Sequence, residues 1–347
     1  MESDHNETIT RKKDHIDLCL NEDVSFNSVT NGFENYYFEH CAVTEIEYDK
    51  IDLSAKFFGQ KVSYPFLISC MTGGTEEAKG INEELAVIAS ELNIPIGIGS
   101  QRQALEDSSM HNTYKAIREN AKNIPVLSNI GAAQVAMLKD IGEIEFLIEL
   151  IQADALVIHL NPLQELLQKN GQPNFNGLVK NIELITKKIK QPVIAKEVGS
   201  GISKRAAKKL LDAGVRGIDV AGAGGTSWAE VEQKRNNISN HFFRNWGLPT
   251  AYCVNETSKL KKSYYFTLIA SGGIKNGIEI AKALALGADF AASARPVLQS
   301  LVKNGIDGTI ELLKSWFEDV KKIMYLTGCS NLKKFSKQKL LKAGDIY

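Results

Sequence analysis

The stretch "ALVIHLNPLQE" at residues 155–165 places an apolar run directly before a cluster of polar side chains. The run "ALVIHL" is typical of a strand that is buried on both faces of a parallel sheet. Burying an unpaired amide or carboxylate costs about 2–7 kcal/mol, so core strands avoid such groups. We therefore expect four polar groups to lie in water or against a polar ligand at the end of the strand: His159, Asn161, Gln164 and Glu165.

Runs of this kind recur along the chain, and each is followed by a longer amphipathic stretch. There are eight of them, at residues 65–71, 95–99, 125–130, 155–160, 192–198, 217–222, 267–273 and 290–296. The first four begin thirty residues apart, which is about what one strand, one crossover helix and two loops require. Eight parallel units predict an α/β fold, the closed (β/α)8 TIM barrel; the alternative, a doubly wound open sheet, normally needs fewer.

Helical patterns fill the intervals between these runs, at residues 82–92, 113–121, 143–151, 178–189, 203–214 and 276–288. We expect one barrel domain over residues 1–347, with an N-terminal arm at 1–60, the barrel strands and helices at 65–296 and a helical tail at 297–347. The interval 223–266 is far longer than a usual loop, which predicts a cover over the active site.

Composition restricts the class of protein. Lys plus Arg equals Asp plus Glu at 41 each, so no overall charge favours nucleic acid or a membrane surface. The five cysteines are widely spaced and form no C-x-x-C pair, which disfavours a disulfide framework and a structural zinc site. The N-terminus lacks an apolar signal core, and no segment has about 18 uncharged apolar residues. These features predict a cytoplasmic protein that binds neither membrane nor nucleic acid.

Glycine-rich turns follow the last two strand-like runs. In such barrels the functional groups lie at the C-terminal ends of the strands, and a phosphate is often held by backbone N–H groups after the last two. The turns "SGGIKNG" (271–277) and "ASARP" (292–296) stand at those positions. They suggest a phosphorylated cofactor, although a Gly-Gly pair before a helix is often only a tight turn.

Charged residues at strand ends have more than one interpretation. Lys196 ends an apolar run, where a lysine is rarely buried without an anion. It either forms a salt bridge with Glu197 or another carboxylate, or is itself the cation that lies beside the N1–C2=O edge of a flavin. Arg102 lies just past a strand end, where a substrate anion is favoured over a surface position.

Two further clusters have weaker signals. The basic run from Arg11 to His15 has the composition of a solvated arm. Trp228 and Glu232 share one face if their segment is helical, and Trp228 packs either in the core or on an apolar substrate tail. Glu232 and the Glu165 carboxylate suit a hard cation such as Mg²⁺. His159 has no second histidine at metal spacing, so we expect it to donate a hydrogen bond to phosphate or flavin.

Together these motifs resemble those of the type 2 isopentenyl-diphosphate Δ-isomerases, flavoenzymes with a (β/α)8 barrel. The resemblance covers nearly the whole chain, and it is most specific at "HLNPLQE" and at "GGTSW" followed by "NWGLPT". The matching motifs are "TRKKDHI" (10–16), "MTGGT" (71–75), "GSQR" (99–102), "SNIGA" (128–132), "HLNPLQE" (159–165), "KEVGSG" (196–201), "GAGGTSWAEVE" (222–232), "RNWGLPT" (244–250), "ASGGIKNG" (270–277) and "ALALGA" (283–288).

The resemblance implies a set of site residues. It implies catalytic roles for Gln164, Lys196, Trp228 and Glu232, and Mg²⁺ binding at Glu165. FMN would be bound by Ser69, Cys70, Met71, Thr72, Ser100, Asn129, Lys196, Thr226, Gly273, Ile274, Lys275, Ala294 and Arg295. The substrate diphosphate would be bound by Arg11, Lys12, Ser100, Gln101, Arg102, His159, Asn161 and Gln164.

The resemblance also implies the reaction and the assembly. Isopentenyl diphosphate and dimethylallyl diphosphate would be interconverted by adding and removing a proton with reduced FMN, in isoprenoid biosynthesis, and NADPH or NADH would serve only to reduce the flavin. The protein would form a homo-oligomer, a tetramer or an octamer, in which the N-terminal arm reaches a neighbouring subunit. Two positions depart from the family pattern: Ser200, where an aromatic residue is common, and Ala221, where serine is common.

Three other functions fit the barrel less well. A 2-hydroxy-acid oxidase commonly has an H-x-G-x-R arrangement after the seventh strand, and "SGGIKNG" contains no histidine. An inosine-monophosphate dehydrogenase needs a nucleophilic cysteine in the sixth-strand loop, and "AGGTSWAEVE" has none. A binding-only barrel that acts as a sensor or scaffold is disfavoured by Gln164, Glu165, Lys196 and Trp228, and a turnover measurement excludes it.

Overall fold

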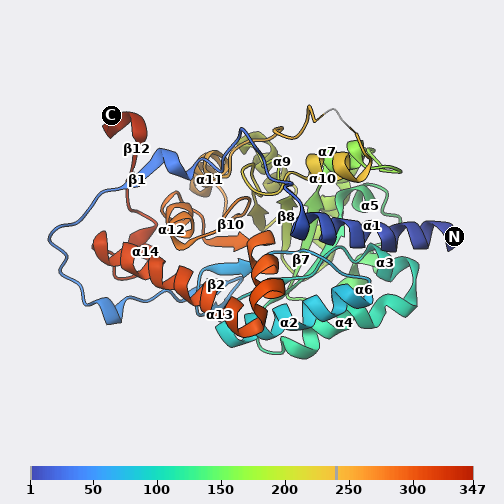
Figure 1. Cartoon of the computed structure of the whole chain (residues 1–347), viewed down its shortest axis with the longest axis horizontal. Helices are drawn as coiled ribbons and strands as arrows, with labels where there is room; N and C mark the ends of the chain where they lie inside the picture. The colour runs from blue at the N-terminus through green and yellow to red at the C-terminus, as the bar shows by residue number, and fades with distance from the viewer. Residues whose placement is uncertain (1, 239–240, 347) are drawn as a thin grey trace.

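The computed structural model describes residues 2–238 and 241–346. Within these residues, eight parallel strands close into a barrel, because β11 pairs with β4 (Figure 1). The expected TIM barrel is therefore confirmed, and each strand coincides with one of the apolar runs, with β6 extending one residue beyond its run. The barrel strands are β4 (Phe66–Ile68), β5 (Ile96–Gly97), β6 (Val126–Gly131), β7 (Ala155–Leu160), β8 (Val193–Glu197), β9 (Gly217–Asp219), β10 (Thr267–Ala270) and β11 (Phe290–Ser293).

Helices surround the barrel, and their ends have identifiable stop and start signals. Thr75 caps the first of them by accepting the N–H of Ala78, and Asn93 ends it in the left-handed conformation. All six expected helices are present within a few residues of the expected bounds. The outer helices are α2 (Glu76–Leu92), α4 (His111–Asn120), α6 (Gly142–Leu150), α8 (Leu178–Lys188), α9 (Lys204–Asp212), α11 (Thr250–Ser258), α12 (Gly277–Ala285) and α13 (Arg295–Leu326).

Helix α13 lies where a C-terminal tail was expected. It bends at Gly305, which has φ 68° and ψ −170°, and it packs against both α12 and α2. This helix therefore occupies the last position in the outer ring, between the helices that follow β10 and β4. After it come α14 (Leu332–Phe335), β12 (Leu340–Lys342) and α15 (Ala343–Ile346).

Shorter elements complete the described residues. At the strand-end side lie α3 (Arg102–Glu106), α5 (Ala132–Ala136), α7 (Pro162–Leu167) and α10 (Trp228–Arg235). Short 3₁₀ helices are η1 (Phe33–Asn35), η2 (Tyr48–Lys50), η3 (Ser108–Met110) and η4 (Lys259–Lys262). The hairpin of β2 (Ala55–Phe57) and β3 (Gln60–Val62) places Phe57 and Val62 against the apolar barrel interior, which closes the N-terminal end of the barrel.

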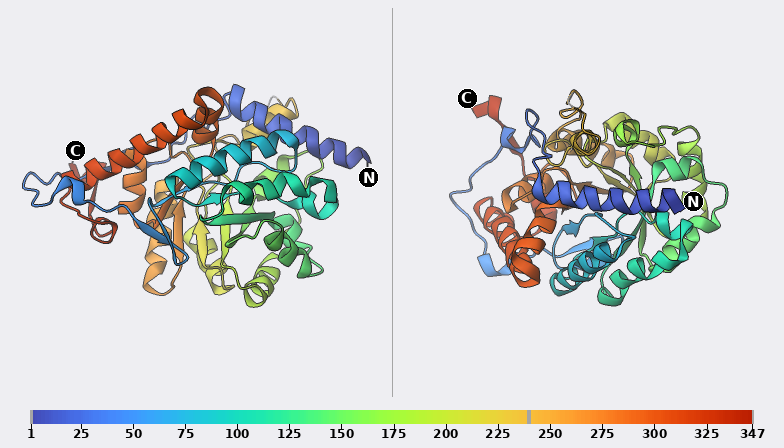
Figure 2. Two further views of the ribbon diagram at one scale, coloured as in Figure 1. Left: turned by 90° about the horizontal axis from the view of Figure 1, so that it is seen from below. Right: turned by 45° about the vertical axis from the view of Figure 1, so that its right-hand side comes forward.

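The N-terminal arm is helical and lies on its own barrel. Helix α1 (Glu2–Asn21) runs beside α10 and α13 (Figure 2). The rest of the arm includes β1 (Tyr36–Phe38), which pairs with β12. The family resemblance places this arm in the site of a neighbouring subunit, whereas here it covers the site of its own chain.

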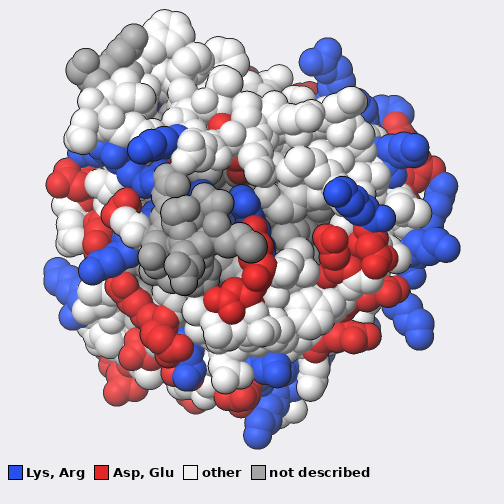
Figure 3. Space-filling model, turned by 90° about the vertical axis from the view of Figure 1, so that its right-hand side faces the viewer, with Lys and Arg blue, Asp and Glu red and all other residues white. Residues whose placement is uncertain are grey.

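The surface agrees with the balanced composition. Basic and acidic side chains both occur over the face shown in Figure 3, in line with a formal net charge of +0. Among the described residues, no helix combines the length and the apolar character needed to cross a membrane.

Candidate active site

A row of polar side chains lines the inside of the barrel near the C-terminal ends of the strands. In the strand register His159 is level with Lys196, and Lys196 is level with Asp219. At one end of the row His159 Nδ1 lies 2.7 Å from Asn129 Oδ1, and at the other Ser271 Oγ donates to Asp219 Oδ1 at 2.6 Å. Residues two positions earlier on these strands, such as Val157 and Ile194, belong to the apolar interior. The polar row therefore lies directly above the apolar core.

His159 has one hydrogen-bond arrangement that fits its neighbours. Burial, together with the charge of Lys196, lowers the pKa of His159 to about 4, so the ring is neutral near pH 7. The Asn129 amide donates from Nδ2 to the Ile98 carbonyl at 3.1 Å, which leaves its oxygen to accept from His159 Nδ1. His159 Nε2 is then an acceptor. The expected donation from this ring to phosphate therefore requires uptake of a proton.

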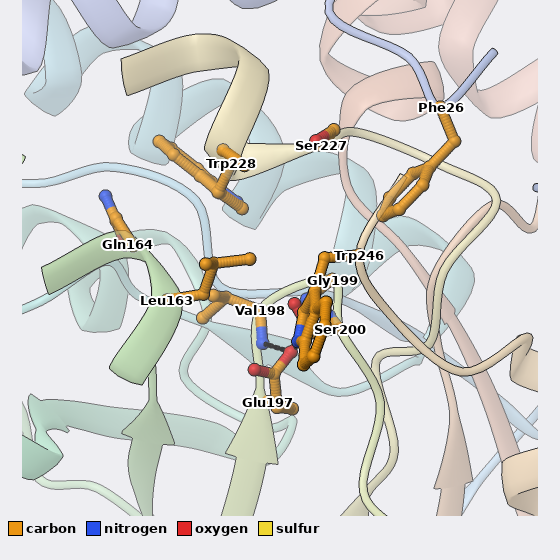
Figure 4. A pocket seen from close by; sticks show the side chains of 11 residues that line it. Phe26, Leu163, Gln164, Glu197, Val198, Gly199, Ser200, Ser227, Trp228 and Trp246 are labelled. Atoms are coloured by element: carbon orange, nitrogen blue, oxygen red, sulfur yellow. Dashed lines mark hydrogen bonds between the residues drawn. The ribbon is translucent and has the colours of Figure 1, made fainter. Parts of the chain in front are cut away.

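Lys196 is not paired with the Glu197 carboxylate. Its ammonium donates to the Glu197 backbone oxygen at 2.8 Å and lies 4.0 Å from Asp219 Oδ2. Glu197 Oε2 instead accepts backbone N–H groups, including those of Val198 and Gly199 at 2.7 Å each (Figure 4). Burial raises the pKa of Glu197 to about 6, and these N–H donors oppose the shift. Of the two carboxylate alternatives for Lys196, pairing with Glu197 does not occur, and another carboxylate, that of Asp219, lies at ion-pair distance.

Gln164 and Glu232 come together from two helices. Gln164 Nε2 on α7 donates to Glu232 Oε1 on α10 at 3.1 Å. His15 of α1 lies 2.9 Å from the same oxygen, and Arg235 donates to Glu232 Oε2 at 3.2 Å. Burial alone would raise the pKa of Glu232, but the hydrogen bonds from His15 and Gln164 and the charge of Arg235 outweigh it, so the pKa is lowered. Glu232 is therefore an ionised acceptor inside the site.

Trp228 lies in the same region, and its segment is helical, which is the condition under which Trp228 and Glu232 share one face. Ser227 caps α10 by accepting the Glu230 N–H at 3.3 Å, so Trp228 and Glu232 lie one turn apart. The Trp228 ring meets the His15 ring edge-on, with centroids 5.0 Å apart. These contacts bring α1 against α10.

A small pocket lies beside Gln164 and Trp228. Its volume of about 10 Å³ is comparable to the space of one water. Figure 4 shows Trp228 and Gln164 on one side, with Ser200 and Trp246 on the other. The remaining lining residues are Phe26, Leu163, Glu197, Val198, Gly199, Ser227 and Ala229. Beside the polar Gln164–Glu232 pair, the walls of this pocket are largely apolar.

Two glycine pairs form a cradle of backbone beside the polar row. A Cβ on Gly225 would lie 2.5 Å from the Gly273 nitrogen, and a Cβ on Gly273, whose φ is +76°, would lie 2.5 Å from the Gly224 oxygen. Asn31 fixes this approach by donating to the Gly273 oxygen at 2.8 Å. After the sixth and seventh barrel strands the backbone carries no side chains at these glycines. A phosphate group can therefore approach the backbone N–H groups closely. The donor set therefore fits the phosphate of a nucleotide cofactor.

The other predicted cofactor residues surround the mouth with different contacts. Arg295 donates to backbone oxygens of Cys19 and Glu22, at 2.7 and 2.8 Å, so its guanidinium holds the end of α1. Lys275 is exposed, and its backbone N–H donates to Glu279 at 2.8 Å. Burial raises the pKa of Cys70 to about 11, so this thiol is neutral. The other residues expected to bind FMN also lie on segments at the strand ends; they are Ser69, Met71, Thr72, Ser100, Thr226, Ile274 and Ala294.

Three basic residues gather on the α1 side of the mouth. Lys12 donates to the Gly73 oxygen and, at 3.3 Å, to the Tyr114 hydroxyl. Burial and the Arg11 charge lower the pKa of Lys12 to about 7. Burial, followed by the charge of Arg102, also lowers the pKa of Arg11. Arg102 donates to Glu106 at 2.7 Å. These residues form a concentration of positive charge that suits an anion.

Gln101 is not brought to this group. Its side chain is fully buried; its oxygen accepts Ser128 Oγ at 2.5 Å and the Asn129 N–H at 3.0 Å, and its Nε2 donates to the Leu147 oxygen of α6 at 3.0 Å. This amide connects the strands to the outer helix ring. The Gln101 side chain contacts Ser128, Asn129 and Leu147, and its expected contact with substrate stays a prediction.

Glu165 stands beside the Gln164–Glu232 pair. It accepts from Asn161 Nδ2 at 3.0 Å and from the Gln172 N–H at 2.7 Å. Asn161 Oδ1 is buried without a hydrogen-bond partner among the described residues. Across the residues that the structure describes, no group of three or more His, Cys, Asp or Glu residues could hold a metal ion. A cation held here by Glu165 would need further ligand oxygens, such as those of a bound anion.

Sequence analysis missed several residues of the site. His15 was seen only as part of a basic run, Asn31 carries no motif, and Tyr114 lies inside a helical pattern. Asp219 had a usable signal, because it ends an apolar strand just as Lys196 does. A charged residue at the end of each of two neighbouring strands predicts a pair once the strand order is known.

Comparison with known proteins identifies the family. Residues 157–342 match the model of the FMN-dependent dehydrogenases. The isopentenyl-diphosphate delta-isomerase of Chlorobium phaeobacteroides is 45% identical over 96% of this chain and 96% of its own. The chain belongs to the isopentenyl-diphosphate delta-isomerase family. A second relative of the same name, from Nostoc sp., is 45% identical over 95% of both chains.

Solved structures with lower identity share the fold of this isomerase family member. A mandelate oxidase with an FMN adduct has a TM-score of 0.65 at 17% identity and covers 94% of this chain and 95% of its own. A Pediococcus acidilactici lactate oxidase has a TM-score of 0.68 at 15% identity, with 96% and 94% covered. The glycine cradle and the polar row thus lie in a barrel of the kind that flavoenzymes use.

Proposed function

We propose that this protein is an FMN-dependent isopentenyl-diphosphate delta-isomerase. The observation that carries the proposal is the Gln164–Glu232 pair at 3.1 Å beside the largely apolar pocket and Trp228. Protonating an unactivated alkene needs a positioned proton carrier and a site that stabilises the developing cation. Membership of the family supports the same reaction, because the relatives carry this name.

FMN is the cofactor that fits the cradle and the polar row. The Gly224–Gly225 and Gly272–Gly273 backbone would hold its phosphate, and Lys196 would face its ring system. When bound, reduced FMN supplies an electron-rich ring that can give and take a proton and stabilise positive charge. Asn129 and His159 offer polar edges on the same rim, at 2.7 Å from each other.

The protein's own side chains would manage the proton and exclude water. Glu232 is ionised and accepts from the Gln164 amide, so Gln164 is held with its side chain against the pocket. His15, at 2.9 Å from Glu232, links α1 to the same carboxylate. Trp228 covers the pocket from the α10 side and would keep water from a developing cation.

The diphosphate would bind the positive group on the α1 side of the mouth. Arg11, Lys12 and Arg102 would neutralise it, and Asn161 would donate through its amide. Mg²⁺, held by Glu165 and by diphosphate oxygens, would reduce the remaining charge, since Mg²⁺ usually keeps few protein ligands.

Other features follow from the reaction and the family. Because double-bond migration is redox-neutral overall, NADPH or NADH would be needed only to reduce the flavin. We infer a cytoplasmic homo-oligomer, a tetramer or an octamer, organised as one FMN-binding domain over residues 1–347. These points rest on the family resemblance and on composition.

The test is an anaerobic turnover measurement. Purified protein is incubated with isopentenyl diphosphate, FMN, Mg²⁺ and a catalytic amount of NADPH, and dimethylallyl diphosphate is quantified against NADPH consumed. We expect many turnovers for each NADPH. If FMN binds and no isomer forms, the proposal is wrong, and 2-hydroxy acids such as lactate and mandelate are tested next because oxidases of those acids share the fold.

A further inference from the structure

Asp219 is a buried acidic residue with one unsatisfied oxygen. It is 1% exposed at the end of β9. Its Oδ1 accepts the Ser271 hydroxyl at 2.6 Å and the Ala221 N–H at 3.3 Å. Its Oδ2 has no hydrogen-bond partner among the described residues. An unpaired buried carboxylate oxygen is costly, so this position requires a compensating charge.

Lys196 supplies that charge from the neighbouring strand. The two residues are level in the β8–β9 register, and Lys196 Nζ lies 4.0 Å from Asp219 Oδ2. At that distance the contact is between charges and is too long for a hydrogen bond. Among the described residues, Asp219 is the acidic side chain within ion-pair distance of Lys196. The Glu197 carboxylate instead accepts hydrogen bonds from backbone N–H groups.

Burial raises the pKa of Asp219 overall, while three neighbouring groups favour its ionised form. A hydroxyl and a backbone N–H donate to one oxygen, and an ammonium faces the other. Burial raises the pKa of Asp219, and the Lys196 charge and the Ser271 hydrogen bond oppose that rise. On the far side of Lys196, His159 is neutral. Asp219 is therefore the charge on this rim that balances Lys196.

We propose that Asp219 is a positioning residue that acts through Lys196. Its carboxylate holds the ammonium at the inner rim and so limits how much of the ammonium's positive charge reaches the cofactor. This inference rests on the proposed placement of Lys196 beside FMN. Lys196 keeps its hydrogen bond to the Glu197 oxygen when Asp219 is changed, so the effect of the carboxylate charge can be measured separately.

The midpoint potential of bound FMN tests the proposal. Asp219→Asn keeps the shape of the side chain and removes the negative charge, so the reduced flavin is stabilised and its potential rises. We expect the ratio of reduced to oxidised FMN at a fixed potential to rise at least tenfold, or about 30 mV for a two-electron couple. The matched control Ser271→Ala removes the 2.6 Å bond but leaves both charges, and it should leave the potential nearly unchanged.

A second pair of variants tests whether Lys196 carries the effect. In a Lys196→Met background, Asp219→Asn should no longer raise the potential. An equal rise in both backgrounds would show that the carboxylate acts on the flavin directly, and an unchanged or lower potential in Asp219→Asn would show a structural role; either result overturns the proposal. If Lys196→Met does not retain FMN, Lys196→Arg replaces it, and there the rise must persist because the cation remains.

Failure of this inference is distinguishable from failure of the proposed function. Wild-type protein that binds FMN and does not isomerise contradicts the function, and the potentials can still be compared. Wild-type protein that isomerises while Asp219→Asn has the wild-type potential contradicts only the role of Asp219.

Discussion

Gln164 is the residue on which the proton-transfer proposal depends most directly. Its amide lines the pocket and donates to Glu232 at 3.1 Å. Gln164→Ala removes this amide while leaving the FMN cradle intact. We expect flavin binding to be retained and kcat to fall about 100-fold, the lower range for loss of a proton-transferring group. Steady-state turnover with the flavin absorbance as a check measures both.

The matched control for that variant is Gln60→Ala. Gln60 is an exposed amide of the β3 hairpin at the closed end of the barrel, and it donates to Asp154 at 2.6 Å. Its loss should leave kcat unchanged. Wild-type turnover in Gln164→Ala would remove Gln164 from the mechanism.

Glu165 is the residue expected to bind Mg²⁺. Its two oxygens accept from Asn161 and Gln172, and Glu165→Gln keeps the shape of the side chain while removing the charge and one of the two acceptors. We expect the Mg²⁺ concentration for half-maximal activity to rise at least about tenfold, because a neutral amide is a weak ligand for a hard cation. An activity titration with Mg²⁺ checks this, and Glu143→Gln, on the exposed side of α6, is the control. The same titration curve for Glu165→Gln and wild type would reject the ligand role.

Lys12 predicts a pH dependence of substrate binding. Its pKa is lowered to about 7 in the free protein, so above pH 7 it is mostly neutral. A bound diphosphate favours the ammonium form, so binding takes up a proton and the affinity falls as the pH rises above 7, by at most about tenfold per pH unit. Below pH 7 this group no longer contributes to the dependence.

The dissociation constant of isopentenyl diphosphate, measured by calorimetry from about pH 7 to about pH 9, checks this prediction. Lys12→Arg is the control, since arginine stays charged throughout this range. Its affinity should vary less with pH than that of the wild type. Parallel curves for the two proteins would mean that Lys12 does not titrate on binding.

At the scale of elements, the strands were predictable and the glycine cradle was predictable only in part. Apolar runs of five to seven residues introduced by proline or glycine predicted buried strands, and all eight form strands in the expected order. The sequence "SGGIKNG" indicated a phosphate turn. It did not indicate that the Gly224–Gly225 pair would pack onto it, because that approach depends on the register between β9 and β10.

The cradle predicts the effect of Gly273→Ala. At φ +76° a Cβ is strained by about 1–2 kcal/mol, and it would lie 2.5 Å from the Gly224 oxygen. The backbone must shift, so we expect the FMN dissociation constant to rise at least about tenfold while the fold persists. Gly59→Ala is the control, because Gly59 has φ +95° with no atom within 4 Å of the added Cβ. Fluorescence titration of apoprotein with FMN measures both variants, and equal affinities would mean that the cradle does not hold the phosphate.

Side-chain direction at strand ends could not be read from the sequence. Gln101 and Arg102 follow the same strand, yet Gln101 turns into the helix ring and Arg102 lies on the side of the basic group. Strand period fixes which residues face inward along β5 and stops being informative in the turn that follows. The position of a residue just past a strand end therefore does not determine where its side chain points.

At the scale of the whole molecule, the position of α1 is the feature that sequence patterns did not determine. This helix is held by long-range polar contacts, such as His15 with Glu232 and Cys19 with Arg295, and not by a broad apolar stripe. Periodicity reports apolar faces and does not report single polar contacts between distant segments. The sequence therefore showed a basic run in the arm. The position of the arm as a helix on the barrel depends on contacts with residues far away in the chain.

The arm predicts the outcome of a complementation experiment. An arm variant, Arg11→Ala with Lys12→Ala, and a barrel variant, Gln164→Ala, are each expected to be nearly inactive. If α1 serves its own barrel, as the contacts of Lys12 and His15 place it, mixed oligomers of the two variants contain no complete site and stay inactive. If the arm serves a neighbouring subunit, some sites in the mixture combine a wild-type arm with a wild-type barrel, and activity returns. The two variants are co-expressed with different tags, purified through both tags and assayed for dimethylallyl diphosphate. Recovery of activity would show that the arm exchanges between subunits in the working enzyme.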